Sequence, residues 1–234
     1  MTPQIIDRLN AINRQFYETT AQKFDQTRQR SWAGWQPLAA YLAAPLRVLD
    51  VGCGNGRFGL FLHDVLDGEI IYHGVDNNAQ LLAYAREALA PHSRLQVTIT
   101  EQDVIVDPLP TGNYDAVALF GVIHHVPGFD NRRHFVTQLA ERVAQGGLLI
   151  MAMWRFYEYE RFRQRFVPFP DDLPVEQHDY LLDWRSGERA LRYCHYVDDA
   201  ELEVLIRASG LQEVTRYRAD GTDNAMNQYI ILRR

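Results

Sequence analysis

A glycine-rich segment between a predicted strand and a predicted helix constrains this fold more than any other part of the chain. The apolar run RVLDVG precedes it, the segment RFGLFLHDVL follows, and glycines stand at positions 52, 54, 56 and 59. Closely spaced glycines at such a junction let the backbone turn sharply and approach a ligand. The segment therefore predicts a ligand-binding loop at the edge of an α/β sheet.

The residues around this loop repeat a strand–helix pattern. From about residue 46 to 154, short apolar runs alternate with amphipathic segments, as in EIIYHGVD followed by NAQLLAYAREALA. Such alternation is typical of βαβ units on a parallel sheet. After residue 197, DDAELEVLIRASG predicts a capped helix ending at Gly210, and LQEVTRYRA and NQYIILRR predict two strands that close the sheet antiparallel. We therefore predict one α/β domain with a doubly wound, mostly parallel sheet.

We expect a single domain over residues 1–234 with four parts. Two of these parts, at the N-terminus and before the last helix, lie outside the strand–helix repeat. Residues 1–45 are expected to form a helical cap, 46–154 the ligand-binding core, and 197–234 the closing helix and strands. Residues 155–196 form an insertion rich in aromatic residues and arginine, before the last helix. It is expected to be a lid or a substrate wall, although aromatic residues in an insertion more often pack it onto the body. Its arginines are Arg155, Arg161, Arg163, Arg165, Arg185, Arg189 and Arg192.

The glycine segment fits two kinds of cofactor loop, and its charge separates them. Gly54, Gly56 and Gly59 satisfy GxGxxG, the dinucleotide pattern, whereas the same loop with Asp50 ahead of it matches S-adenosylmethionine enzymes. A carboxylate next to a helix N-terminus repels a pyrophosphate, but it favours the ammonium and sulfonium groups of S-adenosylmethionine. The loop residues predicted to contact S-adenosyl-L-methionine are Asp50, Gly52, Cys53, Gly54 and Gly56.

Further cofactor contacts are expected where the next strands end. Asp76 ends the second strand, where a carboxylate can accept hydrogen bonds from both ribose hydroxyls; alternatively, it is a surface turn residue. Gln102 and Asp103 close the third strand, where a side chain can meet the adenine amino edge; a helix-capping or turn acid is the alternative. Phe120 ends the fourth strand, at the edge where open α/β sheets bind ligands. The neighbouring residues in the predicted cofactor site are Asn77 and Val104.

Together these motifs resemble the class I S-adenosylmethionine-dependent methyltransferases over residues 46–154, through VLDVGCGNGRF, GVD, the fourth strand and GGLLIM. The chain also resembles, in scattered blocks, the tRNA wobble-uridine methyltransferases that methyl-esterify 5-carboxymethyluridine. That resemblance rests on YETTAQKFDQTR at 17–28, Trp32, VIHH at 122–125 followed by Arg132 and Arg133, and RYCHYV at 192–197, where Cys194 replaces the family's usual tyrosine. It implies a Rossmann-like methyltransferase fold, a tRNA substrate and, in the related enzymes, a small zinc-binding activator subunit.

The resemblance implies that Arg28, His124 and Tyr17, with His195, flank the methyl-acceptor pocket. A carboxylate acceptor needs no strong base, and Arg28 can orient one of its oxygens by bidentate geometry. A hydroxyl or amine acceptor instead requires a general base, for which His124 or His125 is the candidate. The alternatives are a solvated helix face for Arg28, core packing for Tyr17 and a structural role for one of the histidines.

The net charge of −6 argues at first against a nucleic-acid partner, whose phosphates attract basic side chains. The acidic excess, however, lies in residues 48–154, whereas residues 1–47 carry six basic and three acidic side chains. Net charge therefore leaves an RNA substrate open. A small-molecule O- or N-methyltransferase, an S-adenosylmethionine-binding protein without turnover, and a nicotinamide dinucleotide enzyme remain as alternatives.

The sequence also bounds the compartment and the metal content. No apolar run approaches the ~20 residues that span a membrane, and the first residues lack the apolar stretch of a secretory signal. We therefore expect a cytoplasmic protein without a membrane partner. Cys53 and Cys194 are too few for a disulfide framework or a zinc cluster, and the histidines show no metal-ligand spacing. No metal is expected, and Cys53 is expected to be a small loop residue because methyl transfer needs no covalent enzyme intermediate.

Overall fold

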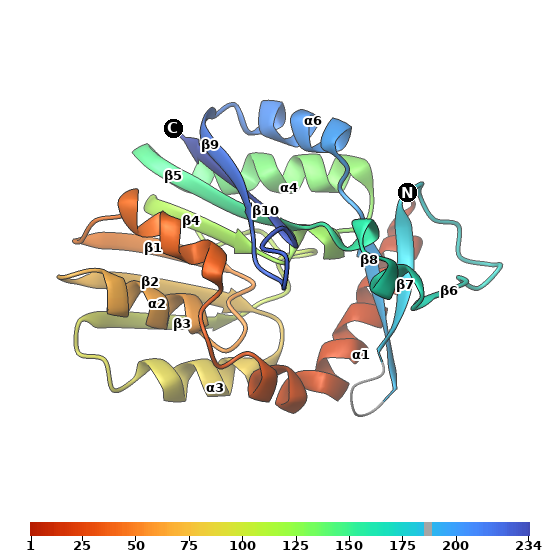
Figure 1. Cartoon of the computed structure of the whole chain (residues 1–234), viewed down its shortest axis with the longest axis horizontal. Coiled ribbons are helices and arrows are strands. Elements are labelled where there is room, and N and C mark those ends of the chain that lie inside the picture. Colours follow the sequence, from red (N-terminus) through yellow and green to blue (C-terminus); the bar gives the residue numbers. More distant parts are fainter. Residues whose placement is uncertain (185–188) are drawn as a thin grey trace.

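The computed structural model describes residues 1–184 and 189–234, and Arg185 of the predicted insertion lies outside them. The main sheet has seven strands, which are β1 (Leu46–Val51), β2 (Ile70–Asp76), β3 (Leu95–Glu101), β4 (Tyr114–Phe120), β5 (Val143–Trp154), β9 (Gln212–Ala219) and β10 (Asn227–Arg233). They lie in the order β3-β2-β1-β4-β5-β10-β9 (Figure 1). β1 to β5 pair in parallel, and β10 runs antiparallel to both of its neighbours. The predicted doubly wound sheet is confirmed.

Helices cover both faces of the sheet because the strands alternate two sets of apolar side chains. In β4, Ala116 and Ala118 face one core with Phe58, whereas Val117 and Leu119 face the other. Figure 1 shows two of these helices together along one side of the sheet. That face is covered by α4 (Phe129–Arg142) and α6 (Asp199–Ser209), and the opposite face by η1 (Ala33–Ala40), α2 (Arg57–Val65) and α3 (Ala79–Leu89).

The predicted C-terminal helix is confirmed as α6, with both of its expected end signals. The Asp198 side chain accepts a hydrogen bond from the Glu201 N–H at 2.8 Å, which caps the first turn. Gly210 ends the helix in the left-handed region, at φ 67°.

Among the described residues, no helix combines the length and the apolar character that crossing a bilayer requires.

The N-terminal segment and the insertion meet beside the main sheet. The first residues form α1 (Pro3–Thr27), in line with the predicted helical cap, and α1 packs against β8 and α3 (Figure 1). The insertion builds a second, antiparallel sheet in the order β6-β7-β8, which the sequence pattern did not indicate. The elements of this region are η2 (Ile123–His125), η3 (Phe156–Glu158), α5 (Glu160–Arg163), β6 (Phe166–Val167), β7 (Asp179–Trp184) and β8 (Ala190–His195).

A buried network of charged side chains joins this second sheet to the main domain. Arg132 of α4 is 1% exposed; its Nε donates to Glu201 at 2.6 Å and its Nη2 to Glu176 at 3.1 Å. His195 of β8 lies between Glu201 and Asp179, with each ring nitrogen 2.7 Å from a carboxylate oxygen. The network therefore fixes β8, and with it the insertion, to α4 and α6.

We predict that Arg132→Met lowers the free energy of unfolding by about 3 kcal/mol, because it leaves the partly buried carboxylates of Glu176 and Glu201 without their cation. Chemical denaturation followed by circular dichroism measures this loss. Arg133→Met is the matched control, since Arg133 is 52% exposed and pairs with Asp130 at the surface; its effect should stay below ~1 kcal/mol. Equal stabilities for the two variants would contradict a structural role for the network.

Candidate active site

The glycine loop from Gly52 to Gly56 connects β1 to α2 at the carboxyl edge of the main sheet. Its first two N–H groups both donate to the Val75 carbonyl, at 2.8 and 3.0 Å, which ties the loop to the end of β2. Gly52 has a φ of 75°, and an added Cβ would lie 2.2 Å from the Val122 side chain. Only glycine fits there. At this position glycine is therefore required by packing against Val122, whereas the sequence suggested that it allows a ligand to approach the backbone.

A small cavity of about 100 Å³ lies between this loop and α1. Gly54 borders it, and a Cβ added at Gly54 would meet only Phe24, at 3.8 Å, so the loop backbone is open to a ligand on this side. Helix α1 covers the cavity with Asn10, Asn13 and Tyr17. The predicted cofactor residues that line it are Gly52, Gly54, Asp76, Asn77, Gln102, Asp103, Val104 and Phe120.

Asp76 holds the glycine loop and faces the cavity at the same time. One carboxylate oxygen accepts the Gly54 N–H at 2.9 Å, and the other accepts the Asn78 N–H at 3.0 Å. Burial raises the pKa of Asp76, and these N–H donors oppose that shift. The residue thus lines an interior cavity, where its remaining lone pairs are available to ligand hydroxyls.

Asp103 ties α1 to the end of β3. Its Oδ2 accepts hydrogen bonds from the Asn10 side chain at 2.8 Å and from Arg14 at 3.1 Å, and its Oδ1 accepts the Ile105 N–H at 3.1 Å. The turn-acid alternative considered from the sequence therefore describes part of its role. Gln102 donates its side-chain N–H to the Pro108 carbonyl, so its amide oxygen is the group available to the cavity.

Two predicted cofactor contacts, Asp50 and Gly56, do not line the small cavity or the larger one next to it. Asp50 is 2% exposed and lies behind the loop, where it accepts a hydrogen bond from the Tyr72 hydroxyl at 2.6 Å. Gly56 packs the loop against α3, because an added Cβ would lie within 3.1 Å of Leu89 and Ala85. This geometry assigns both residues a supporting role in place of the predicted direct contact.

Asp50 should make stability depend on pH. Burial raises its pKa to about 7, despite the Tyr72 hydrogen bond that lowers it, whereas in the unfolded chain the value is about 3.9. The folded state therefore keeps a proton that the unfolded chain releases, and the stabilisation present below about pH 4 is lost as pH rises towards 7.

The matched variant is Asp50→Asn, which keeps an oxygen to accept the Tyr72 hydroxyl. The stability difference between wild type and this variant should decline by up to a few kcal/mol from about pH 4 to about pH 7. Urea denaturation at several pH values measures it, and other titrating groups cancel in the difference. A difference that stays constant over this range would contradict the assignment.

A larger cavity of about 490 Å³ adjoins the small one, and Tyr17, Phe24, Gly52 and Phe120 line both. Arg28 and His124, predicted to flank the acceptor pocket, line the larger cavity together with Tyr17. The sheet edge therefore offers a loop-bordered cavity and, next to it, a roomier one with cationic and aromatic walls.

Comparisons with known proteins agree with this arrangement. Residues 48–147 match the family described as a methyltransferase domain. The chain is a methyltransferase with the class I fold. Its cofactor is S-adenosylmethionine, and the open face of Gly54 and the Asp76 carboxylate, which border the small cavity, are the groups that would hold part of it.

Two relatives and one solved structure illustrate the likeness. The tRNA (carboxymethyluridine(34)-5-O)-methyltransferase of Schizosaccharomyces pombe is 23% identical over 219 residues, 88% of this chain and 90% of that protein. Its counterpart from Mus musculus is 25% identical over 155 residues, 65% of this chain but 21% of that protein. In fold, the methyltransferase resembles an S-adenosylmethionine-dependent methyltransferase from Methanosarcina mazei, with a TM-score of 0.66, 17% identity, and coverage of 85% of this chain and 97% of that one.

His195 of the methyltransferase does not occupy the place predicted for it. It is absent from the described lining of both cavities, and both of its ring nitrogens are engaged by Asp179 and Glu201. Burial acts to lower its pKa, but these two carboxylates raise the pKa above its ordinary value. His195 therefore anchors β8, and its predicted place at the acceptor pocket is corrected.

His125, which the sequence suggested only as an alternative general base, lines the small cavity. Its Nε2 lies 3.0 Å from the Tyr17 hydroxyl, and its Nδ1 lies 3.0 Å from the Tyr193 carbonyl and 3.2 Å from the Asn13 side chain. In the neutral ring, Nδ1–H donates to the carbonyl and Nε2 accepts from Tyr17. Burial and the charge of Arg192 lower its pKa to about 3, so the ring is neutral at physiological pH.

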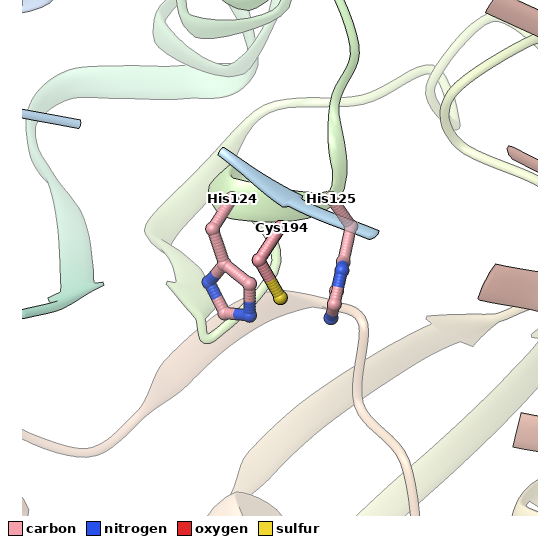
Figure 2. A group of neighbouring side chains, drawn as sticks. All are labelled: His124, His125 and Cys194. Carbon is pink, nitrogen blue, oxygen red and sulfur yellow. The ribbon is translucent and has the colours of Figure 1, made fainter. Parts of the chain in front are cut away.

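His124 of the larger cavity and His125 of the small cavity lie close to Cys194, and Figure 2 shows the cysteine sulfur between the two rings. Their potential ligand atoms lie within 4.8 Å of one another. However, both nitrogens of His125 already have hydrogen-bond partners, and the nearby Arg192 cation acts to lower the pKa of the Cys194 thiol, against the larger effect of burial. Because a guanidinium beside the sulfur opposes a second cation, we assign no metal to this cluster.

Cys53 of the methyltransferase is suited to the small-residue role predicted for it. The side chain is 7% exposed, and burial raises the pKa of its thiol well above the ordinary value. A thiol in this state is a poor nucleophile. Its sulfur packs against β2, since an added Cβ at Gly74 would lie 2.9 Å from it.

Several residues of the larger cavity were not assigned to the site from the sequence. They come from the segment after α1, the start of α2, the end of β5 and the insertion, so no single motif contains them. The aromatic and arginine content of residues 155–196 was the available signal, together with the RYCHYV run. These lining residues include Trp32, Arg57, Trp154, Phe162, Trp184 and Arg192.

Proposed function

We propose that this methyltransferase transfers a methyl group to a carboxylate, that of 5-carboxymethyluridine at the wobble position of tRNA. The observation that carries the proposal is the larger cavity, in which arginine and aromatic side chains stand next to the glycine-loop cavity. Guanidinium groups match carboxylates by bidentate hydrogen bonding, and aromatic faces stack on nucleobases. The relatives named for carboxymethyluridine in tRNA favour this acceptor.

When bound, the cofactor supplies a sulfonium methyl group, so that a C–O bond to the acceptor forms as the C–S bond breaks and sulfur keeps the electron pair. The chain's own contribution is to hold the acceptor in line, an effect worth up to ~7–11 kcal/mol in favourable cases. Arg28 lines the cavity with its guanidinium stacked 3.8 Å above the Phe24 ring. We assign to Arg28 the role of orienting the acceptor carboxylate, with Tyr17 beside Arg28.

The state of the histidines supports a carboxylate over a hydroxyl or an amine. A hydroxyl or amine acceptor must lose a proton to a base whose pKa lies near neutrality. Burial, with the neighbouring His125 and the nearby cations, lowers the pKa of His124 well below its ordinary value, and the pKa of His125 is about 3. Both rings are weak bases near pH 7, whereas a carboxylate acceptor requires none.

Methyl transfer to defined tRNA tests the proposal. Purified protein is incubated with methyl-labelled S-adenosylmethionine and with tRNA that carries 5-carboxymethyluridine, and the same tRNA with unmodified uridine serves as the control. Label should enter only the modified tRNA, and binding of that tRNA should weaken as salt increases. Absence of tRNA binding even at low ionic strength, with label entering small molecules of a cell extract, would replace this proposal by the small-molecule methyltransferase alternative.

A further inference from the structure

The wall of the larger cavity carries an excess of positive charge, although the whole chain has a net charge of −6. Asp220 is the carboxylate among its described lining residues. That carboxylate already accepts hydrogen bonds from the Tyr229 hydroxyl at 2.6 Å and from the Asn227 side chain at 2.8 Å. The cations are three arginines, Arg28, Arg57 and Arg192.

Arg192 is buried on this wall, and no anionic partner for it is found among the described residues. Its guanidinium carbon lies 5.1 Å from the Phe16 ring centroid and 4.6 Å from that of Trp154, and the residue is 9% exposed. Among the described residues its Nε has no hydrogen-bond partner, and the nearby Cys194 thiol is a neutral group whose pKa is raised by burial to about 11. In residues 1–184 and 189–234, no ion pair involves Arg192.

A buried cation with an unused donor is unfavourable unless something else supplies the anion. Buried charges in proteins are paired or fully hydrogen-bonded, because desolvation otherwise opposes folding. The two aromatic faces offset part of this penalty through cation–π attraction, but they leave Nε without an acceptor. An anionic ligand in the cavity would satisfy both the charge and the donor.

We infer that Arg192 binds the anionic group of the methyl acceptor, as a second cation beside Arg28. This inference rests on the proposed function, since it assigns the residue that recognises the carboxylate. Both guanidinium groups lie close enough to the Tyr17 hydroxyl to lower its pKa, against the larger effect of burial, which raises it. Both arginines line the larger cavity together with Tyr17, so the anionic group of one acceptor in that cavity is assigned to both of them.

Arg57 lies elsewhere on the cavity wall. It starts α2 directly after the glycine loop, and its guanidinium carbon is 5.7 Å from the ring centroids of both Trp32 and Trp35. It is therefore placed beside the cofactor loop, whereas Arg192 lies on the insertion side with Trp154. The wall around Arg192 favours a planar ring that bears a carboxylate, because Trp154 and Phe162 also line the cavity there.

The matched variants are Arg192→Met, which removes the charge at similar volume, and Arg192→Lys, which keeps the charge without the planar fork. Arg163→Met is the control, since Arg163 is an exposed arginine of the same insertion that contacts the Tyr157 ring. Calorimetry in the presence of S-adenosylhomocysteine measures binding of 5-carboxymethyluridine and of its neutral amide, 5-carbamoylmethyluridine. The affinity for S-adenosylhomocysteine reports whether each variant is folded and still binds the cofactor product.

Wild type and Arg163→Met should bind the acid at least about tenfold more tightly than the amide. Arg192→Met should lose this preference, Arg192→Lys should keep part of it, and all three variants should bind S-adenosylhomocysteine like wild type. If Arg192→Met retains the full preference for the acid, the inference is overturned. It is also overturned if both Arg192 variants lose S-adenosylhomocysteine binding together with the preference for the acid.

A second pair of probes, phenylacetate and phenylacetamide, separates failure of this inference from failure of the proposed function. If wild type binds neither uridine but prefers phenylacetate to its amide, and Arg192→Met does not, the uridine acceptor is wrong and the anion site at Arg192 stands. If wild type prefers neither carboxylate over its amide, the inference is overturned.

Discussion

Asp76→Ala is expected to weaken S-adenosylhomocysteine binding by about 10³-fold, because a carboxylate that accepts both ribose hydroxyls contributes two charge-assisted hydrogen bonds. The residue lines the small cavity and also accepts the Gly54 N–H at 2.9 Å. Its loss therefore removes a ligand contact and loosens the loop that borders the cofactor. Isothermal titration calorimetry measures the affinity directly.

Asp115→Ala provides the matched control for Asp76. Its carboxylate also accepts a backbone N–H, that of Arg47 at 2.7 Å, but it lies at the start of β4, away from the carboxyl edge. S-adenosylhomocysteine affinity should be unchanged in this variant. Unchanged affinity in Asp76→Ala as well would remove Asp76 from the cofactor site.

Arg28→Ala should reduce kcat/KM on a carboxylate acceptor by about 10³-fold while S-adenosylhomocysteine binding stays close to wild type. Removing one partner of a desolvated charge pair typically costs about 2–5 kcal/mol, and this pair forms with the acceptor rather than the cofactor. Arg28 lines the larger cavity and is absent from the lining of the small one. Steady-state methylation of modified tRNA, with calorimetry of S-adenosylhomocysteine, separates the two effects.

Arg30→Ala is the control for this prediction, since Arg30 is exposed two residues beyond Arg28 and contributes only its carbonyl, to Arg57. It should retain wild-type kcat/KM, apart from any small loss of general attraction for RNA, which salt removes. Loss of both turnover and cofactor binding in Arg28→Ala would assign Arg28 to the cofactor site or to the fold instead of to the acceptor.

The cofactor half of this enzyme was predictable from the sequence because its parts are local. The glycine loop, Asp76 and Gln102 each follow a strand, and parallel strands bring their carboxyl ends to one edge. The sequence did not indicate that Asp50 turns towards Tyr72, since the hydroxyl that donates to Asp50 lies on the neighbouring strand β2. A residue can therefore belong to the loop motif without contacting the ligand directly.

The acceptor half was less accessible to sequence reasoning because its walls come from distant segments. Arg28 and Arg192 are brought together only when α1 packs on β8. His195 resembled a site residue, but its role follows from Asp179 and Glu201, whose approach depends on the second sheet and α6. That sheet arises in an aromatic segment without strict polar–apolar alternation, so its strands gave no clear period of two.

The chemical nature of the transferred label tests the central claim most directly. Methyl esters are cleaved by mild alkali and release methanol, whereas methyl groups on a nucleobase nitrogen or a ribose oxygen are stable under those conditions. After incubation with methyl-labelled S-adenosylmethionine and tRNA carrying 5-carboxymethyluridine, we expect the label to leave the RNA as volatile methanol on mild alkaline treatment. Label that stays bound to the RNA after this treatment would contradict a carboxylate acceptor.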